Sequence, residues 1–304
     1  MAPFNALDTA NTMRKAMKGL GTDDKALIAA TVCLNNEQLQ EVRKVYQTEL
    51  KRDLLEDIKS ETSGEYERAL VGLILTRAEF DAKELRRAVK GAGTDEDVFV
   101  QTLCHRTQEE IKAIKDAYLA MFGKTLQHDI EGDFSGDGKK FALGLVNMDH
   151  ASPKEVSAAQ IDEWVHKLYS AGEGKLGTDE DTFVEAICGN GPEWLRAMNE
   201  AYGRKHGHTL VSAVKREFSG FAAKGLAAMI RDHDEYYAEL IWAACDGAGT
   251  DEAALTRVMV ARRHRLPDIN NRFMAKYNVS IEHRIKSEVS ANYGKIMLAI
   301  AKAS

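Results

Sequence analysis

Four copies of one short motif limit the folds that this chain of 304 residues can adopt. The motif is glycine, any residue, glycine, threonine and aspartate, at residues 19–23, 91–95 and 247–251, with lysine replacing the first glycine at residues 175–179. Its second glycines are Gly21, Gly93, Gly177 and Gly249, so the intervals are 72, 84 and 72 residues. Self-similarity at a regular interval is the signature of a repeat protein. The chain is therefore expected to contain four homologous modules.

Between the motifs, apolar residues recur at the spacing of amphipathic helices. Leu39, Val42 and Tyr46, for example, stand three and four positions apart and predict one apolar stripe. We expect an all-α protein with five short helices per module, which in the first module span residues 8–18, 23–34, 37–48, 51–60 and 64–75. The modules are predicted at residues 5–76, 79–148, 156–232 and 234–302. A longer polar link at residues 149–159 predicts that the first two modules form one pair and the last two another.

Charge and motif content argue against several classes of function. A formal net charge of −6 without a basic tract argues against nucleic acid binding. No signal-peptide core and no apolar run of about 18 residues occurs, so a soluble, cytoplasmic protein is expected. The HExxH, Gly-x-Ser-x-Gly and P-loop motifs are missing, so the protein is not expected to be an enzyme. His206 and His208 are expected to face solvent, and Cys104 and Cys188 to be buried free thiols.

The motif itself can be interpreted as a turn between two helices. In that interpretation a glycine ends one helix and Thr22 caps the next, and Thr94 and Thr178 are each followed three positions later by an acid, as in a capping box. The aspartates of the motif then lie in the first helical turn, where negative charge is stabilised. We therefore expect these four aspartates to stabilise the N-terminal end of the helix and not to be the main metal ligands: Asp23, Asp95, Asp179 and Asp251.

A second set of acids is more distant in the sequence. Glu61, Asp133 and Glu217 each stand forty positions after the second glycine of their module. In the fourth module the acid is Glu288, at thirty-nine positions, and a serine that follows the acid by two residues in every module shifts with it. This shift predicts a one-residue deletion near residues 261–267.

A glycine-rich loop and a distant carboxylate together can bind a hard cation. Glycines allow several carbonyl oxygens to point toward one place, and a carboxylate can add two more oxygens. Such a set suits Ca²⁺, which takes 6–8 oxygen ligands in irregular geometry, with weak affinity of about 10⁻⁵–10⁻³ M. Phosphate oxygens of a lipid headgroup could fill the remaining positions. An acidic protein would then bind an anionic membrane through calcium.

The fourfold motif with its distant acid resembles the annexins, and the resemblance covers nearly the whole chain. It implies five-helix repeats packed into a curved disc, with calcium loops that face phospholipid on its convex face. The implied ligands are the carbonyls of Met17, Gly19 and Gly21 with Glu61; Val89, Gly91 and Gly93 with Asp133; Gly172, Lys175 and Gly177 with Glu217; and Cys245, Gly247 and Gly249 with Glu288. Secondary sites would pair Thr22 with Asp24, Thr94 with Glu96, Thr178 with Glu180 and Thr250 with Glu252.

The resemblance also implies partners and leaves alternatives open. The expected partner is an anionic phospholipid membrane on the cytoplasmic side, bound by a monomer that can self-associate there, and only a very short tail precedes the first repeat. Leu20 and Leu176 at the loop tips predict that the first and third modules lead insertion. Cys245 and Asp246 depart from the family pattern, which makes the fourth module the weakest lipid contact. A cytoskeletal role, as in the annexin-like giardins, and ion conduction through charged residues are the alternatives; those residues are Asp81, Glu84, Arg106 and Arg257.

Overall fold

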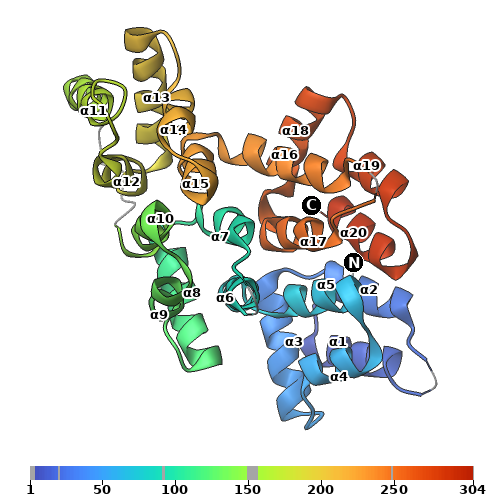
Figure 1. The fold of residues 1–304 in the computed structure, drawn as a ribbon. Helices are drawn as coiled ribbons and strands as arrows, with labels where there is room; N and C mark the ends of the chain where they lie inside the picture. The colour runs from blue at the N-terminus through green and yellow to red at the C-terminus, as the bar shows by residue number, and fades with distance from the viewer. Residues whose placement is uncertain (1–3, 20, 91–92, 149–156, 248, 304) are drawn as a thin grey trace. The chain divides into compact units, whose positions relative to one another are not determined.

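The structure is a computed structural model that describes residues 4–19, 21–90, 93–148, 157–247 and 249–303. Within these residues the regular elements are helices and no strand is present. The elements fall into four successive groups of five α-helices (Figure 1), which we call helices A to E of each repeat. The predicted all-α fold class is confirmed.

The helix bounds show the repetition directly. The first repeat contains α1 (Ala6–Ala16), α2 (Asp24–Val32), α3 (Asn36–Thr48), α4 (Leu54–Glu61) and α5 (Gly64–Ile74). The second contains α6 (Arg77–Val89), α7 (Glu96–Leu103), α8 (Gln108–Phe122), α9 (Leu126–Asp133) and α10 (Gly136–Asn147). The third contains α11 (Ala158–Ala171), α12 (Glu180–Cys188), α13 (Pro192–His206), α14 (Leu210–Glu217) and α15 (Gly220–Ile230). The fourth contains α16 (His233–Cys245), α17 (Glu252–Ala261), the 3₁₀ helix η1 (Arg263–Arg265), α18 (Leu266–Tyr277), α19 (Ile281–Glu288) and α20 (Ala291–Lys302).

The helices form where local signals and apolar spacing agree. Asn35 begins α3 with a reciprocal capping box, since its side chain accepts from the Gln38 N–H and the Gln38 side chain accepts from the Asn35 N–H. The predicted stripe of Leu39, Val42 and Tyr46 is fully buried. In the fourth repeat, α17 runs into η1 where the other repeats have a short turn, which is the place where the sequence predicts a deletion.

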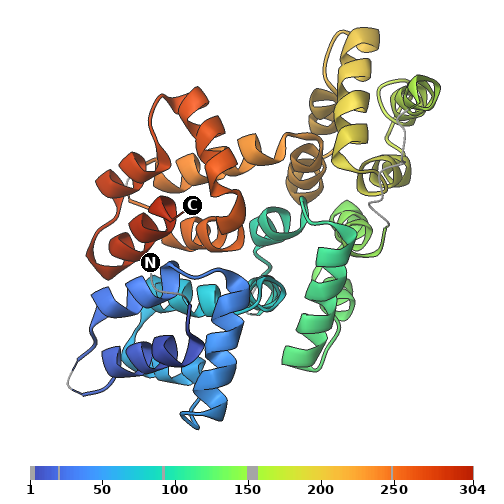
Figure 2. The ribbon, with the colours of Figure 1, turned by 180° about the vertical axis from the view of Figure 1, so that it is seen from behind.

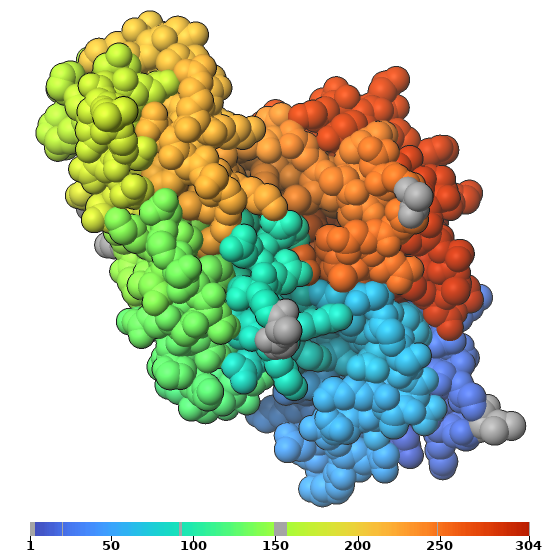
Figure 3. All heavy atoms as spheres, in the orientation of Figure 1, coloured from blue at the N-terminus to red at the C-terminus, as the bar shows by residue number. Residues whose placement is uncertain are grey.

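The repeats associate differently from the predicted pairs. One compact unit contains residues 1–80 and 237–304, and the other contains residues 81–236. The first repeat therefore packs with the fourth, and the second with the third, so the prediction from the link at residues 149–159 was wrong. Figure 3 shows the blue and the orange-red ends of the chain against one another within the first unit. The length of a link shows only how far the chain runs between two repeats. Which repeats pair is decided by the apolar helix faces that they bury against one another.

The same two helices of each repeat form the contact inside both units. In the first unit α5 packs on α17 and α20, and α2 packs on α20, an arrangement that Figure 2 shows from behind. In the second unit α10 packs on α12 and α15, and α15 packs on α7. Helices B and E thus bury one face inside their own repeat and another face against the neighbouring repeat. This explains why α15 is apolar on nearly all sides.

Glycines in the E helices permit close approach of the paired repeats. A Cβ added to Gly144 would lie 2.6 Å from Val184 Cγ1, and one added to Gly225 would lie 2.0 Å from Phe141 Cε1. Gly72 in α5 lies in the contact of the first unit, where an added Cβ would lie 3.1 Å from Val260 Cγ1 of α17. These contacts leave no room for any larger side chain.

Cys104 and Cys188 lie in this interface of the second unit and are buried free thiols, as predicted. The Cys104 thiol lies 3.7 Å from the Gly225 carbonyl oxygen, and burial raises the pKa of the Cys188 thiol. None of the helices in the described ranges combines the length and apolar character needed to cross a membrane.

Candidate metal sites

The A–B loops close in the same way in all four repeats. The N–H of the motif aspartate donates to the carbonyl at or next to the end of helix A, with N–O distances of 2.8 Å from Asp23 to Ala16, 3.0 Å from Asp95 to Ala88, 2.7 Å from Asp179 to Ala171 and 2.8 Å from Asp251 to Ala244. Each of these carbonyls immediately precedes the first predicted ligand. The second glycine of every loop has positive φ, 82° at Gly21 and 81° at Gly177 for instance, which only glycine adopts readily. The four loops therefore share one backbone design.

The distant acids end the D helices. Helices α4, α9, α14 and α19 are each eight residues long, and their last residues are the four predicted acids, Glu61, Asp133, Glu217 and Glu288. The shift in the fourth repeat is thus absorbed before the D helix begins, and Glu288 is the structural equivalent of the other three. Each acid lies where the chain turns sharply into helix E.

The motif threonine links the loop to the distant acid. Thr22 Oγ1 lies 3.3 Å from both the carbonyl oxygen and Oε2 of Glu61. Thr178 Oγ1 donates to Glu217 Oε2 at 2.5 Å, and Thr250 Oγ1 donates to the Glu288 carbonyl at 3.3 Å. Residues separated by about forty positions in sequence therefore meet in three repeats, as the spacing predicts.

This contact corrects the predicted role of the threonines. The N-caps of the B helices are the aspartates, whose side chains accept from the N–H three residues on: Asp23 from Ala26 at 3.0 Å, Asp95 from Val98 at 3.4 Å, Asp179 from Thr182 at 3.3 Å and Asp251 from Ala254 at 2.9 Å. The capping boxes expected at Thr94 and Thr178 do not begin these helices. The motif threonine lies one residue before the cap, so its hydroxyl can turn toward helix D.

The third repeat shows how tightly loop and acid can fit. A Cβ on Gly172 would lie 3.0 Å from Cγ and Cδ of Glu217, so the acid occupies the space that a side chain there would need. The neighbouring Glu173 was not predicted as a site residue, yet it accepts from Tyr202 at 2.8 Å, from Arg216 at 2.7 Å and from His208 Nε2 at 2.7 Å. Despite burial, these bonds hold the pKa of the Glu173 carboxyl below its ordinary value.

The two histidines beside this loop were predicted to face solvent, and that prediction was wrong. His208 pairs with Glu173, and the ring of His206 stacks on Tyr169 with centroids 4.2 Å apart. Desolvation lowers the pKa of His206. Both rings therefore pack, from the C-terminal end of α13, against residues of α11 and of the third loop.

In the first two repeats a different acid supports the loop from helix D. Asp57 accepts from Tyr46 at 2.6 Å and from Arg52, and its Oδ2 lies 3.5 Å from Arg14. In the second repeat Asp129 accepts from Tyr118 and Arg86, each at 2.5 Å. The hydrogen bond from Arg52 holds the pKa of the Asp57 carboxyl below its ordinary value. These pairs of Arg14 with Asp57 and of Arg86 with Asp129 fix helix A against helix D next to the A–B loop.

The remaining predicted ligands are only partly described. Val89 and Asp133 end α6 and α9, but Gly91 and the tip residue Ala92 lie outside the described residues, as do Leu20 and Ala248. Leu176 is described and fully exposed at the tip of the third loop. Of the secondary acids, Asp24 accepts from Asn292 and Glu180 lies 3.3 Å from Lys140, so both already have protein partners.

In the fourth repeat a positively charged side chain, that of Arg284, lies against the predicted ligands. Two of the predicted ligands there, the Cys245 carbonyl and the Glu288 carboxylate, are both contacted by the Arg284 guanidinium. Burial also raises the pKa of the Cys245 thiol to about 11, so the thiol is protonated near neutral pH.

The first and third loops fit a calcium ion by their chemistry. Among the described residues no three His, Cys, Asp or Glu side chains lie close enough together to hold a metal, so a cation in these loops needs main-chain oxygens as well. The predicted oxygen ligands are the carbonyls of Met17, Gly19 and Gly21 or of Gly172, Lys175 and Gly177, with one carboxylate from helix D. Hard oxygen ligands of this kind suit Ca²⁺.

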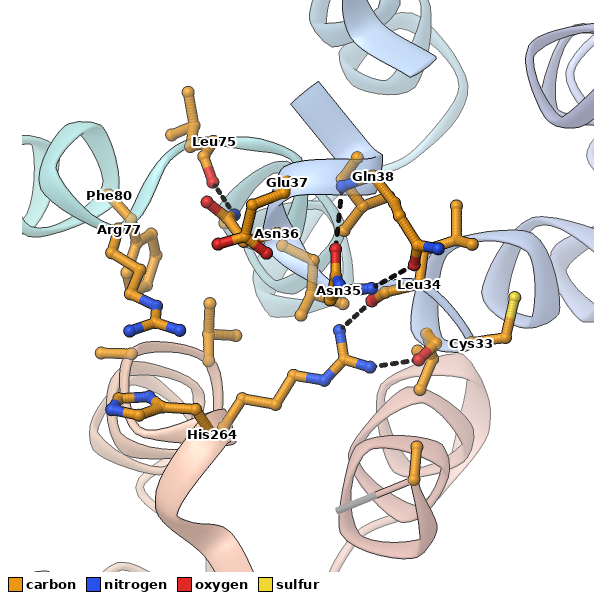
Figure 4. A pocket seen from close by; sticks show the side chains of 18 of the residues that line it. Cys33, Leu34, Asn35, Asn36, Glu37, Gln38, Leu75, Arg77, Phe80 and His264 are labelled. Carbon is orange, nitrogen blue, oxygen red and sulfur yellow. Dashed lines mark hydrogen bonds between the residues drawn. The ribbon is translucent and has the colours of Figure 1, made fainter. Parts of the chain in front are cut away.

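A pocket of about 520 Å³ in the first unit is separate from these loops. It lies at the C-terminal end of α2, whereas the loop precedes the N-terminal end of that helix. Several of its polar groups are hydrogen-bonded within the protein: Figure 4 shows Asn36 donating to the Leu75 carbonyl at 2.8 Å, and Arg263 donates to the carbonyls of Leu34 and Val32. The pocket is part of the packing of the first and fourth repeats.

The sequence model described as Annexin matches four segments of the chain, at residues 8–73, 80–145, 165–229 and 236–300. The chain belongs to the annexin family. Each matched segment contains one A–B loop and one D-helix acid. Annexins are known for calcium-dependent phospholipid binding.

Individual annexins are similar along almost the whole chain. Human annexin A4 is 36% identical over 301 residues, which are 98% of this chain and 94% of the relative. Human annexin A7 is 35% identical over 303 residues, and the chain spans 62% of its length. The solved structure of annexin III has a TM-score of 0.95 at 34% identity and covers 99% of this chain and 95% of that one. A structure described as calcium-bound annexin (Sm)1 has a TM-score of 0.84 at 27% identity, with 98% and 90% covered.

Proposed function

We propose that this annexin binds anionic phospholipid membranes when calcium rises, through Ca²⁺ held between its A–B loops and lipid phosphates. The observation that carries the proposal is the contact between the motif threonine and the D-helix acid, seen for Thr22 with Glu61 and for Thr178 with Glu217. It brings one carboxylate beside a glycine loop that is rich in carbonyl oxygens. A calcium-bound structure exists for the similar annexin (Sm)1, which supports calcium as the cation.

The charge of the protein explains why a bridge is needed. With a formal net charge of −6, the chain and an anionic membrane repel one another unless a cation lies between them. Three protein carbonyls and one carboxylate leave ligand positions that phosphate oxygens can fill. Lys18 and Lys175 in the first and third loops add local attraction for anionic headgroups.

We propose a binding role without catalysis, on the cytoplasmic face of membranes and as a monomer before binding. Annexins are generally non-enzymatic membrane binders. Of the residues that suggested ion conduction, Asp81 and Arg106 form a buried ion pair with 2.6 Å between nitrogen and oxygen, and Glu84 and Arg257 are buried too. Buried pairs of this kind support the packing of helices, so the structure favours the structural interpretation of these charges.

Sedimentation with vesicles tests the proposal. The protein is expected to pellet with phosphatidylserine vesicles only when calcium is present, to be released by a chelator, and to ignore neutral vesicles. A variant with amides at the four D-helix acids, Glu61→Gln, Asp133→Asn, Glu217→Gln and Glu288→Gln, is expected to stay in the supernatant. A matched variant changes four exposed acids of the C helices and should pellet like the wild type: Glu41→Gln, Asp116→Asn, Glu200→Gln and Asp268→Asn. Pelleting that ignores calcium and the first four changes would contradict the proposal.

A further inference from the structure

The fourth loop differs from the other three in what lies against its predicted ligands. Arg284 Nη2 donates to the Cys245 carbonyl at 2.5 Å, and Nη1 lies 3.1 Å from Glu288 Oε1. Nη2 also lies 3.6 Å from Asp246 Oδ1. One guanidinium therefore contacts a predicted calcium-ligand carbonyl, the predicted calcium carboxylate and the extra acid of this loop.

The side chain of Arg284 is held in this place by its surroundings. Its Cζ lies 4.6 Å from the ring centroid of Trp242, which in turn stacks on Tyr277 with centroids 4.1 Å apart. The Arg284 side chain is only 20% exposed, and Glu288 is 24% exposed. A planar guanidinium that stacks on an aromatic ring and binds a carboxylate is well ordered.

Comparison of the repeats shows which sequence change places an arginine against the predicted ligands of the fourth loop. The residue four positions before the D-helix acid is Asp57, Asp129 or Ala213 in the first three repeats and Arg284 in the fourth. The residue three positions before the first ligand carbonyl changes together with it. It is Arg14 or Arg86 where helix D supplies an aspartate, and Trp242 where helix D supplies Arg284.

In the first and third repeats the side chain that contacts the D-helix acid is neutral. Glu61 and Glu217 accept hydrogen bonds from the hydroxyls of Thr22 and Thr178, which carry no charge. In the first two repeats the helix A arginines are paired with Asp57 and Asp129, away from the loop acid. A cation entering the fourth loop would have to displace an ion pair and a charged hydrogen bond.

We propose that the Arg284 guanidinium takes the place of a calcium ion in the fourth repeat. This repeat then does not bind calcium at concentrations that fill the first and third loops. The residues of the fourth loop do not fit a free Ca²⁺, because Cys245 and Glu288 are already bound by a positive charge that repels it. The proposal rests on the proposed calcium sites of the other loops only for the comparison of affinity. The fourth loop is thereby closed onto helix D without metal.

Direct calcium binding tests the proposal in a variant that isolates the fourth loop. Glu61→Gln, Asp133→Asn and Glu217→Gln together remove the acids of the other three loops, and equilibrium dialysis with radioactive calcium then counts what remains. This triple variant is expected to show no saturable site. Adding Arg284→Met is expected to create one site, about tenfold or more tighter than any residual binding, which Glu288→Gln abolishes again.

Two further variants make the result independent of folding defects. Lys286→Met removes an exposed charge of the same helix and is expected to create no site. Arg284→Gln keeps a polar side chain beside Trp242 and is expected to create the same site as Arg284→Met, with calcium raising the melting temperature of both. A site in the triple variant that Glu288→Gln removes would overturn the proposal, and so would the lack of a new site in both Arg284 variants. Calcium binding by the wild type separately tests the proposed function.

Discussion

Single side chains hold the two halves of each site in register. The motif aspartate caps helix B, the motif threonine contacts the D-helix acid in three repeats, and a second polar contact joins helix C to helix D or to the loop. That second contact is Tyr46 with Asp57 in the first repeat and Tyr202 with Glu173 in the third. The fourth repeat has Phe273 at the position of this tyrosine and uses Trp242 and Arg284 instead. The same loop is therefore supported by three different sets of side chains.

Asp57→Asn is expected to destabilise the protein by about 1.5–3 kcal/mol at neutral pH, since Tyr46 and Arg52 lose a charged acceptor. The lowered pKa of Asp57 means that its ionised form is favoured in the folded state, so its stabilising effect is present above the ordinary carboxyl pKa of 3.8. The effect is lost as the pH falls below that value. Urea unfolding at about pH 7 and about pH 3 should show the difference between variant and wild type shrinking in acid.

The control for this prediction is Asp8→Asn, which changes an exposed aspartate of α1 in the same unit. Its effect should stay within about 0.5 kcal/mol, as for other surface substitutions. An equal loss for both variants, or a loss for Asp57→Asn that does not depend on pH, would contradict the role assigned to Asp57.

Ala291→Gly is expected to stabilise the fourth repeat by about 0.5–1 kcal/mol. Ala291 begins α20 with φ of 54°, where the other repeats have Gly64, Gly136 and Gly220 at 64°, 52° and 56°. The left-handed conformation costs alanine about 1–2 kcal/mol, and the greater entropy of unfolded glycine offsets part of the gain. Thermal unfolding should show a higher melting temperature for this variant and a lower one for the reverse change, Gly64→Ala.

The residues of the site differ in how far the sequence predicts them. The D-helix acids and the loop glycines could be predicted because their spacing is repeated, and repetition reveals which positions must meet. Arg284 and Glu173 could not, because each is peculiar to one repeat and acts only after packing brings helix D against the loop. The threonines were predicted to cap helix B, but the aspartate that follows each of them is the cap, since a cap and its preceding residue have similar sequence signals.

Helices B and E are the elements that join repeats, and their glycines set the distance of approach. Gly144 in α10 lies against Val184 and Cys188 of α12, and Gly225 in α15 lies against Phe141 of α10. A helix-interior glycine is normally unfavourable, so these positions trade helix propensity for contact. The fivefold division into helices was predictable from apolar spacing. Which repeats pair was not, because the matching of B and E faces is a property of the folded surfaces.

Gly144→Ala is expected to destabilise the second unit by about 1–3 kcal/mol, because the new Cβ would lie 2.6 Å from Val184 Cγ1. Gly203→Ala is the matched control, since Gly203 lies inside α13 with no neighbouring atom within 4 Å of an added Cβ. That control should stabilise the protein by about 0.5–1 kcal/mol through better helix propensity. Chemical unfolding of both variants measures the two effects, and a gain for Gly144→Ala would refute the close-packing argument.

For the whole molecule, binding depends on several weak sites acting on one membrane. In the proposed function the calcium sites of the loops act together, and the tip side chains add apolar contact with the lipid interface. If Arg284 keeps calcium out of the fourth loop, as we propose, the curve of membrane binding against calcium should reflect three sites.

Leu176→Asp is expected to weaken vesicle binding by about tenfold or more at fixed calcium, because it replaces a fully exposed leucine at the third loop tip with a charge that anionic lipid repels. Leu119→Asp is the control, since Leu119 is a half-exposed leucine of the C helix α8 and belongs to no A–B loop. Vesicle sedimentation across lipid concentrations measures both affinities. Equal losses for the two variants would show that the third loop tip does not enter the interface.

The central claim is that calcium lies between a loop, its D-helix acid and a lipid phosphate, and calcium affinity measured with and without vesicles tests it most directly. Binding is reciprocal, so a membrane that completes the coordination must tighten calcium by the factor by which calcium tightens the membrane. We predict that phosphatidylserine vesicles raise the calcium affinity of the wild type at least tenfold, and that the Glu61→Gln, Asp133→Asn, Glu217→Gln variant loses this increase. The same calcium affinity with and without vesicles would contradict the claim.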